Sequence, residues 1–156
     1  MLTSRAHRRR STVYSMLKNL NPLLTGELLG LLQDMGHGDV VAIVDRNYPA
    51  VSTARHLVRL SGTSVNEAAT AVLSVLPVDT FVEPAVFRMG AVGAESSMLD
   101  VHRDFGEILD AAEGRPVPVE PLERFEFYRR AREAFVVIAT TEDRPYGCFL
   151  VTKGVI

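Results

Sequence analysis

Apolar residues recur along the chain in two alternating patterns, one helical and one strand-like. From Asn21 to Gly36, leucines recur at helical spacing behind Pro22, which predicts a helix with Asn21 as its N-cap and Gly36 as its C-cap. The run from Val40 to Val44 is almost wholly apolar and predicts a short strand that is buried on both faces, as in a parallel sheet. The folded part of the chain is therefore expected to begin with a helix and a buried strand.

The same alternation continues to the end of the chain. Ser64 and Glu67 form a capping box ahead of a second helix, which is expected to run to Leu76 and to be closed by Pro77. Further helices are predicted over residues 98–113 and 124–134, and further strands over residues 56–60, 82–89, 135–141 and 146–151. Residues 116–119 contain two prolines and predict an extended connection or an edge strand. We therefore predict a single α/β domain in which helices cover a mostly parallel sheet.

Length and composition are compatible with one globular domain. A chain of 156 residues buries roughly two thirds of the surface that its unfolded form exposes. Hydrophobic residues make up 47% and charged residues 23%, and no run approaches the roughly 20 apolar residues of a membrane span. Cys148 is the single cysteine, which excludes an intramolecular disulfide and argues against a thiolate-rich zinc site. We expect a cytoplasmic protein without membrane partners.

Charge is distributed unevenly. The formal net charge is -2, but the first ten residues carry four arginines and no acidic residue, so the chain from Ser11 onward carries about -6. This basic start lacks the apolar run of a secretory signal. We expect residues 1–15 to form a flexible basic extension and residues 16–156 to form the domain. The acidic character of the domain argues against nucleic acid as a partner.

The segment that joins the first helix to the first strand holds a candidate catalytic group. His37 lies between Gly36 and Gly38, which leave room for a ligand to approach the imidazole, and a histidine can donate or accept a proton near neutral pH. The alternative is a histidine that only interacts with the last carbonyls of the helix. Asp45 follows the buried strand directly, at the edge where open α/β sheets usually place ligands.

Other candidate groups carry weaker signals. His56 and His102 are isolated from residues at metal-ligand spacing, so both are expected to be structural. Ser52 and Ser61 lack the context of a nucleophile elbow, and the sequence contains no glycine-rich phosphate loop. Cys148 lies at the start of the strand predicted over residues 146–151 and is expected to be a buried, unreactive thiol. We expect neither a metal site nor a cofactor.

Two groups of residues, one near each end of the domain, together resemble a known family. The first consists of Met35, Gly36, His37, Gly38 and Asp39, followed by Asp45, Asn47, Tyr48 and Pro49. The second consists of Arg124, Phe125, Phe127 and Tyr128, followed by Tyr146 and Gly147 and by Lys153, Gly154 and Val155. In order and spacing they resemble the fucose mutarotase and ribose pyranase (RbsD/FucU) family over roughly residues 16–156. Gly38 and the segment that begins at Arg124 are more similar to the fucose branch.

The resemblance implies an isomerase that interconverts the anomers of a free monosaccharide without a cofactor. It implies that His37 is the proton donor and that Asp45 binds sugar hydroxyls. It also implies a pocket lined by Arg124 and by Tyr146, Gly147 and Cys148, with Arg46 and Tyr128 as additional pocket residues. Family members are ring-shaped homo-oligomers, often decamers, with the pocket at a subunit boundary.

The chain departs from the family pattern at two positions. Cys148 stands where the family has asparagine, so a weakly bonding thiol replaces an amide that both donates and accepts hydrogen bonds. Arg46 stands beside Asp45, where it is expected to pair with Asp45, to face an acidic substituent of a sugar, or to remain solvated. If Cys148 has disabled the pocket, the alternative function is a non-catalytic sugar-binding or transport-associated protein.

Overall fold

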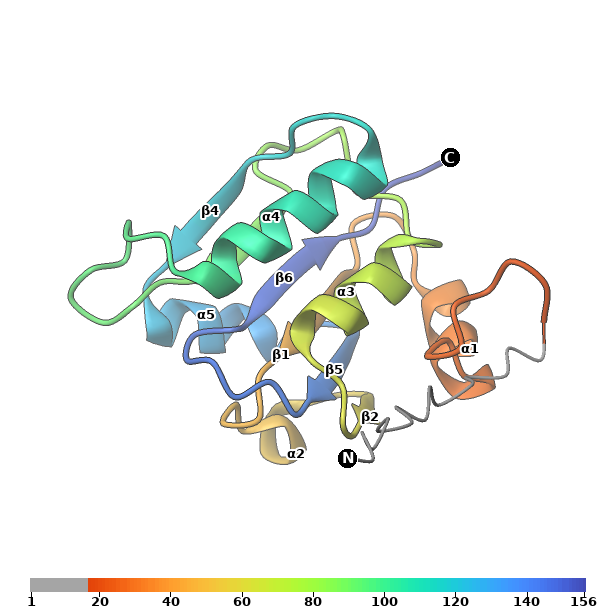
Figure 1. Cartoon of the computed structure of the whole chain (residues 1–156), viewed down its shortest axis with the longest axis horizontal. Helices are drawn as coiled ribbons and strands as arrows, with labels where there is room; N and C mark the ends of the chain where they lie inside the picture. Colours follow the sequence, from red (N-terminus) through yellow and green to blue (C-terminus); the bar gives the residue numbers. More distant parts are fainter. Residues whose placement is uncertain (1–16) are drawn as a thin grey trace, which may run out of the picture.

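The computed structural model describes residues 17–156, and the basic extension expected over residues 1–15 lies outside this part of the chain. The described residues contain one six-stranded sheet with the strand order β2-β5-β1-β6-β3-β4 (Figure 1). The strands are β1 (Val40–Val44), β2 (Leu57–Leu60), β3 (Val86–Met89), β4 (Val119–Leu122), β5 (Val136–Thr140) and β6 (Phe149–Thr152). β6 runs antiparallel to its neighbours β1 and β3, whereas β1 and β2 pair parallel with β5, and β3 pairs parallel with β4. The prediction of a mostly parallel sheet in a single α/β domain is confirmed.

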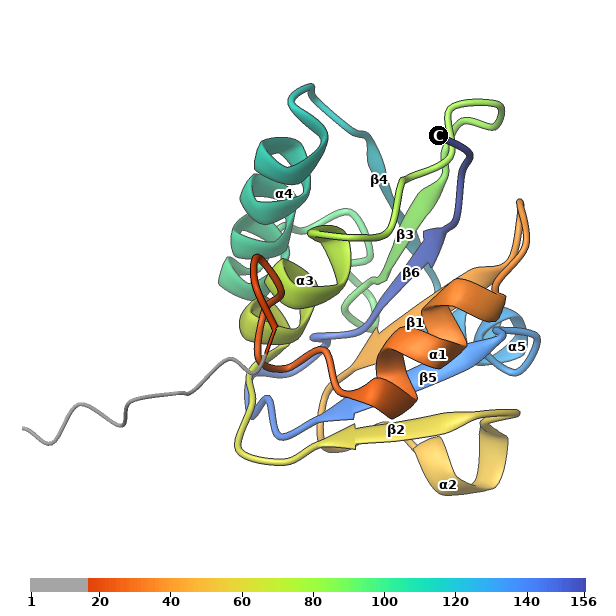
Figure 2. The ribbon, with the colours of Figure 1, turned by 90° about the vertical axis from the view of Figure 1, so that its right-hand side faces the viewer.

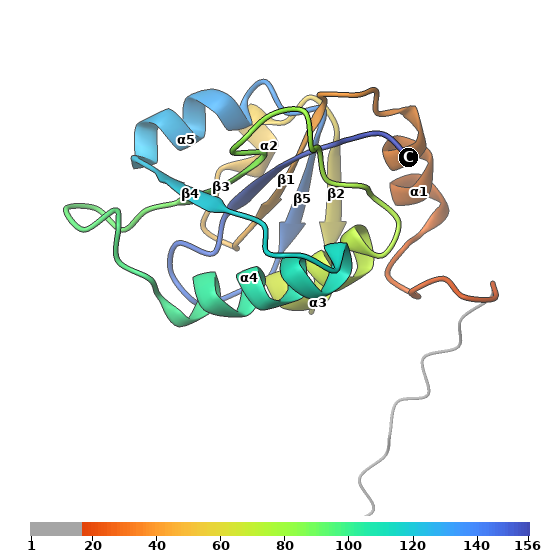
Figure 3. The ribbon, with the colours of Figure 1, turned by 90° about the horizontal axis from the view of Figure 1, so that it is seen from above.

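Helices cover both faces of this sheet. They are α1 (Gly26–Asp34), α2 (Ala50–Thr53), α3 (Val65–Leu73), α4 (Asp100–Glu113) and α5 (Arg124–Ala131). Seen from above, α3 and α4 lie on one side of the sheet, and α2 and α5 lie on the other (Figure 3). The buried residues of α1 belong to the same hydrophobic cluster as those of α3 and α4. The sheet is therefore the middle of three layers.

The alternation of side chains along β1 explains why this strand is apolar throughout. Val41 and Ile43 pack in the cluster beneath α1, α3 and α4, whereas Ala42 and Val44 pack in the cluster beneath α5. All four side chains are completely buried. Because successive residues of a strand point to opposite faces, a central strand between two helical layers must be apolar at every position. The predicted strand and its bounds are confirmed.

The first helix begins later than the sequence predicts. The Asn21 side chain accepts a hydrogen bond from the Leu23 backbone N–H (3.0 Å), and this turn does not continue into a helix. Thr25 is the N-cap of α1, and its hydroxyl accepts from the Leu28 backbone N–H (3.2 Å). Asn21 and Thr25 are both favourable capping residues and lie four positions apart, and the helix starts after Thr25. The predicted N-cap at Asn21 was wrong, whereas the capping box of Ser64 and Glu67 at the start of α3 is confirmed.

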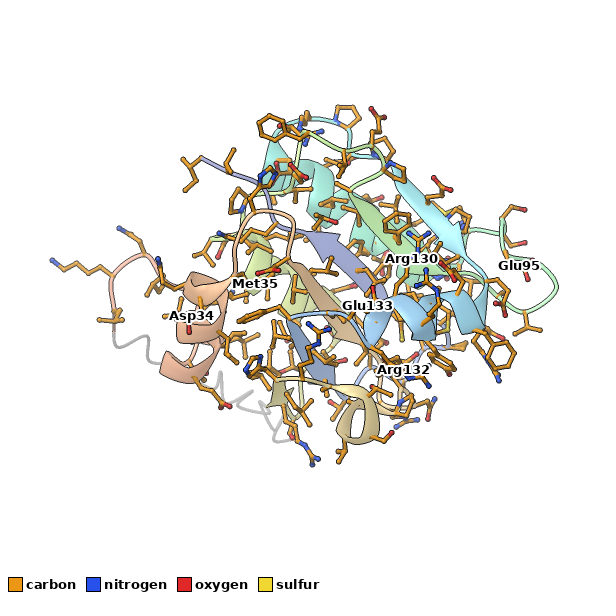
Figure 4. All side chains as sticks on the ribbon, turned by 180° about the vertical axis from the view of Figure 1, so that it is seen from behind. Asp34, Met35, Glu95, Arg130, Arg132 and Glu133 are labelled. Carbon is orange, nitrogen blue, oxygen red and sulfur yellow. The ribbon has the colours of Figure 1, made fainter. Side chains whose placement is uncertain are left out.

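The elements that flank the predicted pocket are also shorter than expected. α5 ends at Ala131, and Arg130, Arg132 and Glu133 lie around its C-terminal end (Figure 4). Phe127 and Ala131 are buried on the sheet side of α5, whereas Phe125 is exposed. β6 begins only at Phe149, so that residues 146–148 belong to the preceding loop. Sequence periodicity placed these elements correctly but not their ends.

Candidate functional site

The carboxylate of Asp45 is anchored to the backbone at the end of β1. Its Oδ1 accepts hydrogen bonds from the backbone N–H groups of Asn47 (3.0 Å) and Tyr48 (3.1 Å). Its Oδ2 accepts from the backbone N–H of Gly147 (3.2 Å), and the residue is 6% exposed. The neighbouring Cys148 thiol also makes a hydrogen bond with this carboxylate. Asp45 is therefore a hydrogen-bond acceptor held in a fixed position.

The loop before β6 reaches Asp45 because β6 is antiparallel to β1. Ile43, near the end of β1, is paired with Phe149, the first residue of β6. Tyr146, in the loop, has a φ of 59°, a left-handed conformation that non-glycine residues seldom adopt. A Cβ atom at Gly147 would lie 3.1 Å from Cγ of Glu142 and 3.2 Å from a methyl of Val101. The close packing at Gly147 explains why a residue without a side chain stands beside Asp45.

A cavity of about 280 Å³ opens where these segments meet. It is lined by Asp45, Asn47, Tyr48, Met89, Arg124, Tyr128, Pro145, Tyr146 and Cys148. Arg124 and Tyr128 come from α5, which follows β4, and β4 runs in the same direction as β1, so the carboxyl ends of both strands lie at the same end of the sheet. The structure thus brings together Asp45, Arg124, Tyr128, Tyr146 and Cys148, which are separated by up to a hundred positions in the sequence. We refer to this space as the Asp45 cavity.

Arg124 brings a positive charge without a neutralising partner to the Asp45 cavity. Its guanidinium carbon lies 4.8 Å from the ring centroid of Phe125 and 5.8 Å from that of Tyr128. Arg124 forms no ion pair within residues 17–156, and its Nε atom is buried without a hydrogen-bond partner. A guanidinium held against aromatic rings in this way retains donors for an oxygen-rich ligand.

Cys148 contributes a buried thiol to the wall of the cavity. It is 1% exposed, and burial together with the charge of Asp45 raises the pKa of this thiol well above its usual value. The thiol therefore remains protonated and unreactive at neutral pH, as expected from the sequence. Its backbone carbonyl accepts from the backbone N–H of Met89 (3.0 Å).

His37 lies at the opposite end of β1 from Asp45. Figure 2 shows the segment that joins α1 to β1 at one end of the sheet and the loop between β5 and β6 at the other end. The five residues of β1 separate His37 from Asp45 by more than about 16 Å, at roughly 3.3 Å per residue. A single chain therefore does not bring His37 to the Asp45 cavity.

The surroundings of His37 are those of an accessible acid or base. Its Nε2 lies 3.0 Å from Oδ1 of Asp79, and its side chain is 42% exposed. A backbone hydrogen bond from Phe81, assisted by His37, lowers the pKa of Asp79 and keeps its carboxylate charged. The C-cap of α1 is Met35 rather than Gly36, and Nε2 of His37 contacts Asp79 rather than a last carbonyl of this helix. His37 also lines a cavity of about 370 Å³ with Lys153 and the residues after it.

Arg46 lies near the Asp45 cavity but not in it. It is exposed and lines a neighbouring cavity of about 290 Å³, which shares Asp45 and Tyr48 with the Asp45 cavity and to which Arg59 also contributes. In the described part of the chain no ion pair joins Arg46 to Asp45, which excludes the first of the three expected roles. Its backbone N–H donates to the carbonyl of Glu142 (3.2 Å).

Two residues contact these sites although no sequence motif indicated that they would. Asp79, the partner of His37, follows a Pro-Val dipeptide in a segment without a recognisable motif. His102, which was expected to be merely structural, donates through Nε2 to the carbonyl of Tyr146 (3.0 Å). Only the folded chain reveals these contacts, because 42 and 44 positions separate the partners.

Neither a cluster of metal-binding side chains nor a membrane-spanning helix occurs within residues 17–156. This part of the chain holds no group of three or more His, Cys, Asp or Glu side chains placed to bind a metal ion. None of its helices combines the length and the hydrophobicity needed to cross a membrane.

Comparison with known proteins shows the same family over nearly the whole described chain. The model of the RbsD / FucU transport protein family matches residues 18–156. The L-fucose mutarotase of Histophilus somni (strain 2336) is 33% identical over 140 residues, which cover 90% of this chain and 97% of that protein.

Two solved structures extend the likeness to three dimensions. The candidate sugar-binding protein Atu2016 is 44% identical, with a TM-score of 0.88 over 92% of this chain and 99% of the other. The fucose mutarotase of Streptococcus pneumoniae in complex with L-fucose is 27% identical, with a TM-score of 0.80 over 90% of this chain and 99% of that chain. The described fold, the order of the site residues and these likenesses agree, and the chain belongs to the RbsD/FucU family.

Proposed function

We propose that the protein is a monosaccharide mutarotase, an isomerase that interconverts the anomers of a free aldose without a cofactor. The observation that carries the proposal is the Asp45 cavity, where a fixed carboxylate, an unpaired guanidinium and tyrosines converge. Such a set of acceptors, donors and aromatic faces suits a polyhydroxylated ring. The likeness to L-fucose mutarotases, one of them in complex with L-fucose, supports an L-fucose-like aldose as the substrate.

In this proposal the residues of the Asp45 cavity bind the sugar. Asp45 accepts a hydrogen bond from one sugar hydroxyl, and Arg124 donates to ring or hydroxyl oxygens. Tyr128 and Tyr146 contribute ring faces and hydroxyl groups to the walls. Cys148 leaves the wall beside Asp45 without an amide, and Arg46 stays outside the contact with the sugar.

His37 supplies the proton that opens the sugar ring. Mutarotation requires a proton on the ring oxygen and loss of a proton from the anomeric hydroxyl, which yields the open-chain aldehyde; closure on the other face then reverses both transfers. Asp79 accepts the hydrogen on Nε2 of His37, so Nδ1 is the atom that delivers and recovers the proton. Positioned proton transfer of this kind is typically worth about 10²- to 10⁴-fold in rate.

Because His37 is remote from the Asp45 cavity of its own chain, a neighbouring copy must provide it. Phe81, which is 71% exposed, lies beside His37, and Phe125, which is 65% exposed, lies beside Arg124. A contact between these two apolar areas on different copies joins His37 to the Asp45 cavity. Because the two joined surfaces differ, the contact repeats head to tail, and such a contact forms a ring when the rotation between successive copies closes. We propose a ring-shaped homo-oligomer, a decamer as the family resemblance implies, that acts in the cytoplasm.

Saturation-transfer NMR on equilibrated L-fucose, with D-ribose as a second sugar, tests the proposed activity. The protein should accelerate anomer exchange above the rate in buffer, and His37→Gln should lower that acceleration at least 100-fold without unfolding the chain, because His37 is half exposed. His56→Gln is the matched control, since His56 is an exposed histidine whose ring contacts only the Phe135 region. Sugar binding without accelerated exchange would instead support the non-catalytic sugar-binding function.

A mixing experiment tests whether the site is shared between copies. His37→Gln and Asp45→Asn chains are each expected to be inactive alone. Mixed rings contain some boundaries at which an intact His37 faces an intact Asp45 cavity, so exchange activity should return after the two variants are unfolded and refolded together. Failure of mixed rings to recover activity would contradict a site shared between two copies.

A further inference from the structure

The peptide unit that joins Tyr146 to Gly147 is held at both of its polar ends. Its carbonyl, on Tyr146, accepts a hydrogen bond from Nε2 of His102 (3.0 Å). Its N–H, on Gly147, donates to Oδ2 of Asp45 (3.2 Å). His102 belongs to α4, and Asp45 directly follows β1. Side chains from two separate elements therefore hold the carbonyl and the N–H of one peptide unit.

The two hydrogen bonds stabilise a peptide unit whose backbone conformation is unusual. Tyr146 has a φ of 59°, which non-glycine residues adopt only when the surroundings require it. A half-turn of the peptide plane would exchange the directions of the carbonyl and the N–H while moving the neighbouring residues little. The Tyr146 carbonyl oxygen would then point at the Asp45 carboxylate and repel it. The Asp45 carboxylate and the Tyr146 side chain, which both line the Asp45 cavity, would therefore shift.

The direction of the hydrogen bond from His102 is determined by its other ring nitrogen. Nδ1 of His102 accepts from the backbone N–H of Leu99 (3.3 Å) and lies 3.2 Å from Nη1 of Arg88. A backbone N–H and a guanidinium can only donate, so Nδ1 carries no hydrogen and Nε2 must carry one. Burial and the nearby charge of Arg88 lower the pKa of His102, so the ring is neutral at physiological pH.

An arginine is unusual at position 88, because this position is buried within the sheet. It lies within β3, is 2% exposed, and forms no ion pair with any residue in the range 17–156. Its Nε is buried without a hydrogen-bond partner, and burial lowers its pKa. A buried guanidinium without a carboxylate is costly. The contact with Nδ1 of His102 is the polar interaction that this side chain makes at its buried end.

We propose that Arg88 and His102 are positioning residues of the sugar site. Arg88 holds His102 in the tautomer with hydrogen on Nε2, and His102 then holds the peptide between Tyr146 and Gly147 so that Asp45 and Tyr146 keep their places. Neither residue touches the sugar. The catalytic part of this inference rests on the proposed mutarotase function, whereas the structural part does not.

The test uses three variants of the full chain. Arg88→Met with His102→Leu removes both polar partners together, because His102→Leu alone would leave the buried guanidinium with no acceptor. His102→Gln keeps one donor and one acceptor in nearly the same place. Phe105→Leu is the matched control, because Phe105 is buried in the same helix, is stacked on Phe149 (3.7 Å between centroids), and has no part in holding the peptide.

Two measurements are made on each variant. The first is hydrogen exchange of the Gly147 amide without sugar, compared with the Ile43 amide of β1, which reports opening of the whole sheet. The second is kcat/KM for anomer exchange of L-fucose. The double variant should show at least tenfold faster Gly147 exchange relative to Ile43 and at least a tenfold lower kcat/KM. His102→Gln and Phe105→Leu should stay within about threefold of the wild type in both measurements.

The outcomes separate this inference from the proposed function. Equal Gly147 exchange in the double variant and in Phe105→Leu would overturn the proposed hold on the peptide. Faster Gly147 exchange with an unchanged kcat/KM would overturn its role in positioning the site. If the wild type does not accelerate anomer exchange, the mutarotase function fails, and the Gly147 amide alone then decides whether Arg88 and His102 hold this peptide.

Discussion

The three residues before β6 use their backbone groups inside the protein, which gives the side chain at position 148 a particular weight. The Tyr146 carbonyl accepts from His102, the Gly147 N–H donates to Asp45, and the Cys148 carbonyl accepts from Met89. Each of these three groups already has a partner inside the protein. We therefore expect contacts between this segment and a sugar to come chiefly from the side chains of Tyr146 and Cys148, and a thiol is a weak hydrogen-bonding group.

We predict that Cys148→Asn strengthens sugar binding. The amide adds a donor and an acceptor to the wall of the Asp45 cavity, and one net hydrogen bond is worth about 1 kcal/mol, or roughly a fivefold to tenfold lower KM for L-fucose. Anomer exchange measured over a range of sugar concentrations gives this KM. Cys148→Ala serves as the control and should leave KM close to that of the wild type. An unchanged or higher KM in Cys148→Asn would show that the sugar does not contact position 148.

At the scale of elements, one ion-pair network ties the loop between β5 and β6 to α3 and α4. The buried carboxylate of Glu142 accepts from the guanidinium of Arg144 (2.9 Å) and from the Val65 backbone N–H at the start of α3 (3.2 Å). Arg144 also donates to Asp104 of α4 (2.7 Å). The hydrogen bond from Arg144 lowers the pKa of Glu142 below its usual value of 4.5. The loop that carries Tyr146 and Gly147 is thus anchored to two helices.

We predict that Glu142→Gln makes the stability of the protein less dependent on pH. Because the folded pKa of Glu142 is lowered, its charged form stabilises the fold above about pH 4.5, and this contribution is lost as the pH falls through the lowered value. Urea unfolding should show a deficit of about 1.5–3 kcal/mol in the variant at pH 7 that shrinks as the pH approaches 3. The exposed Glu133→Gln should show almost no deficit at either pH. A deficit that stays constant between pH 7 and pH 3 would contradict the assigned role of the charge.

At the scale of the whole molecule, the two halves of the proposed site lie at opposite ends of the sheet. His37 with Phe81 lies at one end, and the Asp45 cavity with Phe125 lies at the other. A single copy therefore carries two incomplete sites. Association between copies is expected to be a requirement for catalysis rather than an addition to stability.

We predict that Phe81→Glu separates the assembly and abolishes anomer exchange. The glutamate carboxylate would have to lose its water at the contact between copies, which is costly. The fold of each copy should not depend on position 81, because the Phe81 side chain is 71% exposed. Sedimentation velocity measures the assembly state, and far-UV circular dichroism verifies the fold. Phe81→Tyr, which keeps the ring, should remain assembled and active. Full activity in a monomeric Phe81→Glu protein would refute a site shared between copies.

We also predict that the chain without residues 1–15 keeps the fold and the activity. The family model matches residues 18–156. Every residue that lines the cavity beside His37, and every residue that lines the Asp45 cavity, lies in that range. The truncated chain should melt within a few degrees of the full chain and show the same exchange rate per copy. Loss of exchange in a folded, assembled truncated chain would assign a function to the basic segment.

Local patterns predicted the elements well where one physical requirement dominates. A central strand between two helical layers must be apolar throughout, as β1 is, and the capping box at the start of α3 is formed by Ser64 and Glu67, which are only three positions apart. The start of α1 was mistaken because Asn21 and Thr25 are both good capping residues, and only packing selects between them. The same reason applies to α5, where periodicity cannot tell whether Phe125 or Phe127 faces the sheet.

The sequence by itself determined the family resemblance, the order of elements and most residues of the proposed site, because motifs and periodicities are properties of neighbouring positions. Only the tertiary structure decided which residues meet. An antiparallel β6 places Gly147 against Asp45, whereas the length of β1 separates His37 from both. The partnerships of His37 with Asp79 and of His102 with Arg88 and Tyr146 also depend on the fold. Contacts between distant positions arise from strand order and packing, which no local pattern encodes.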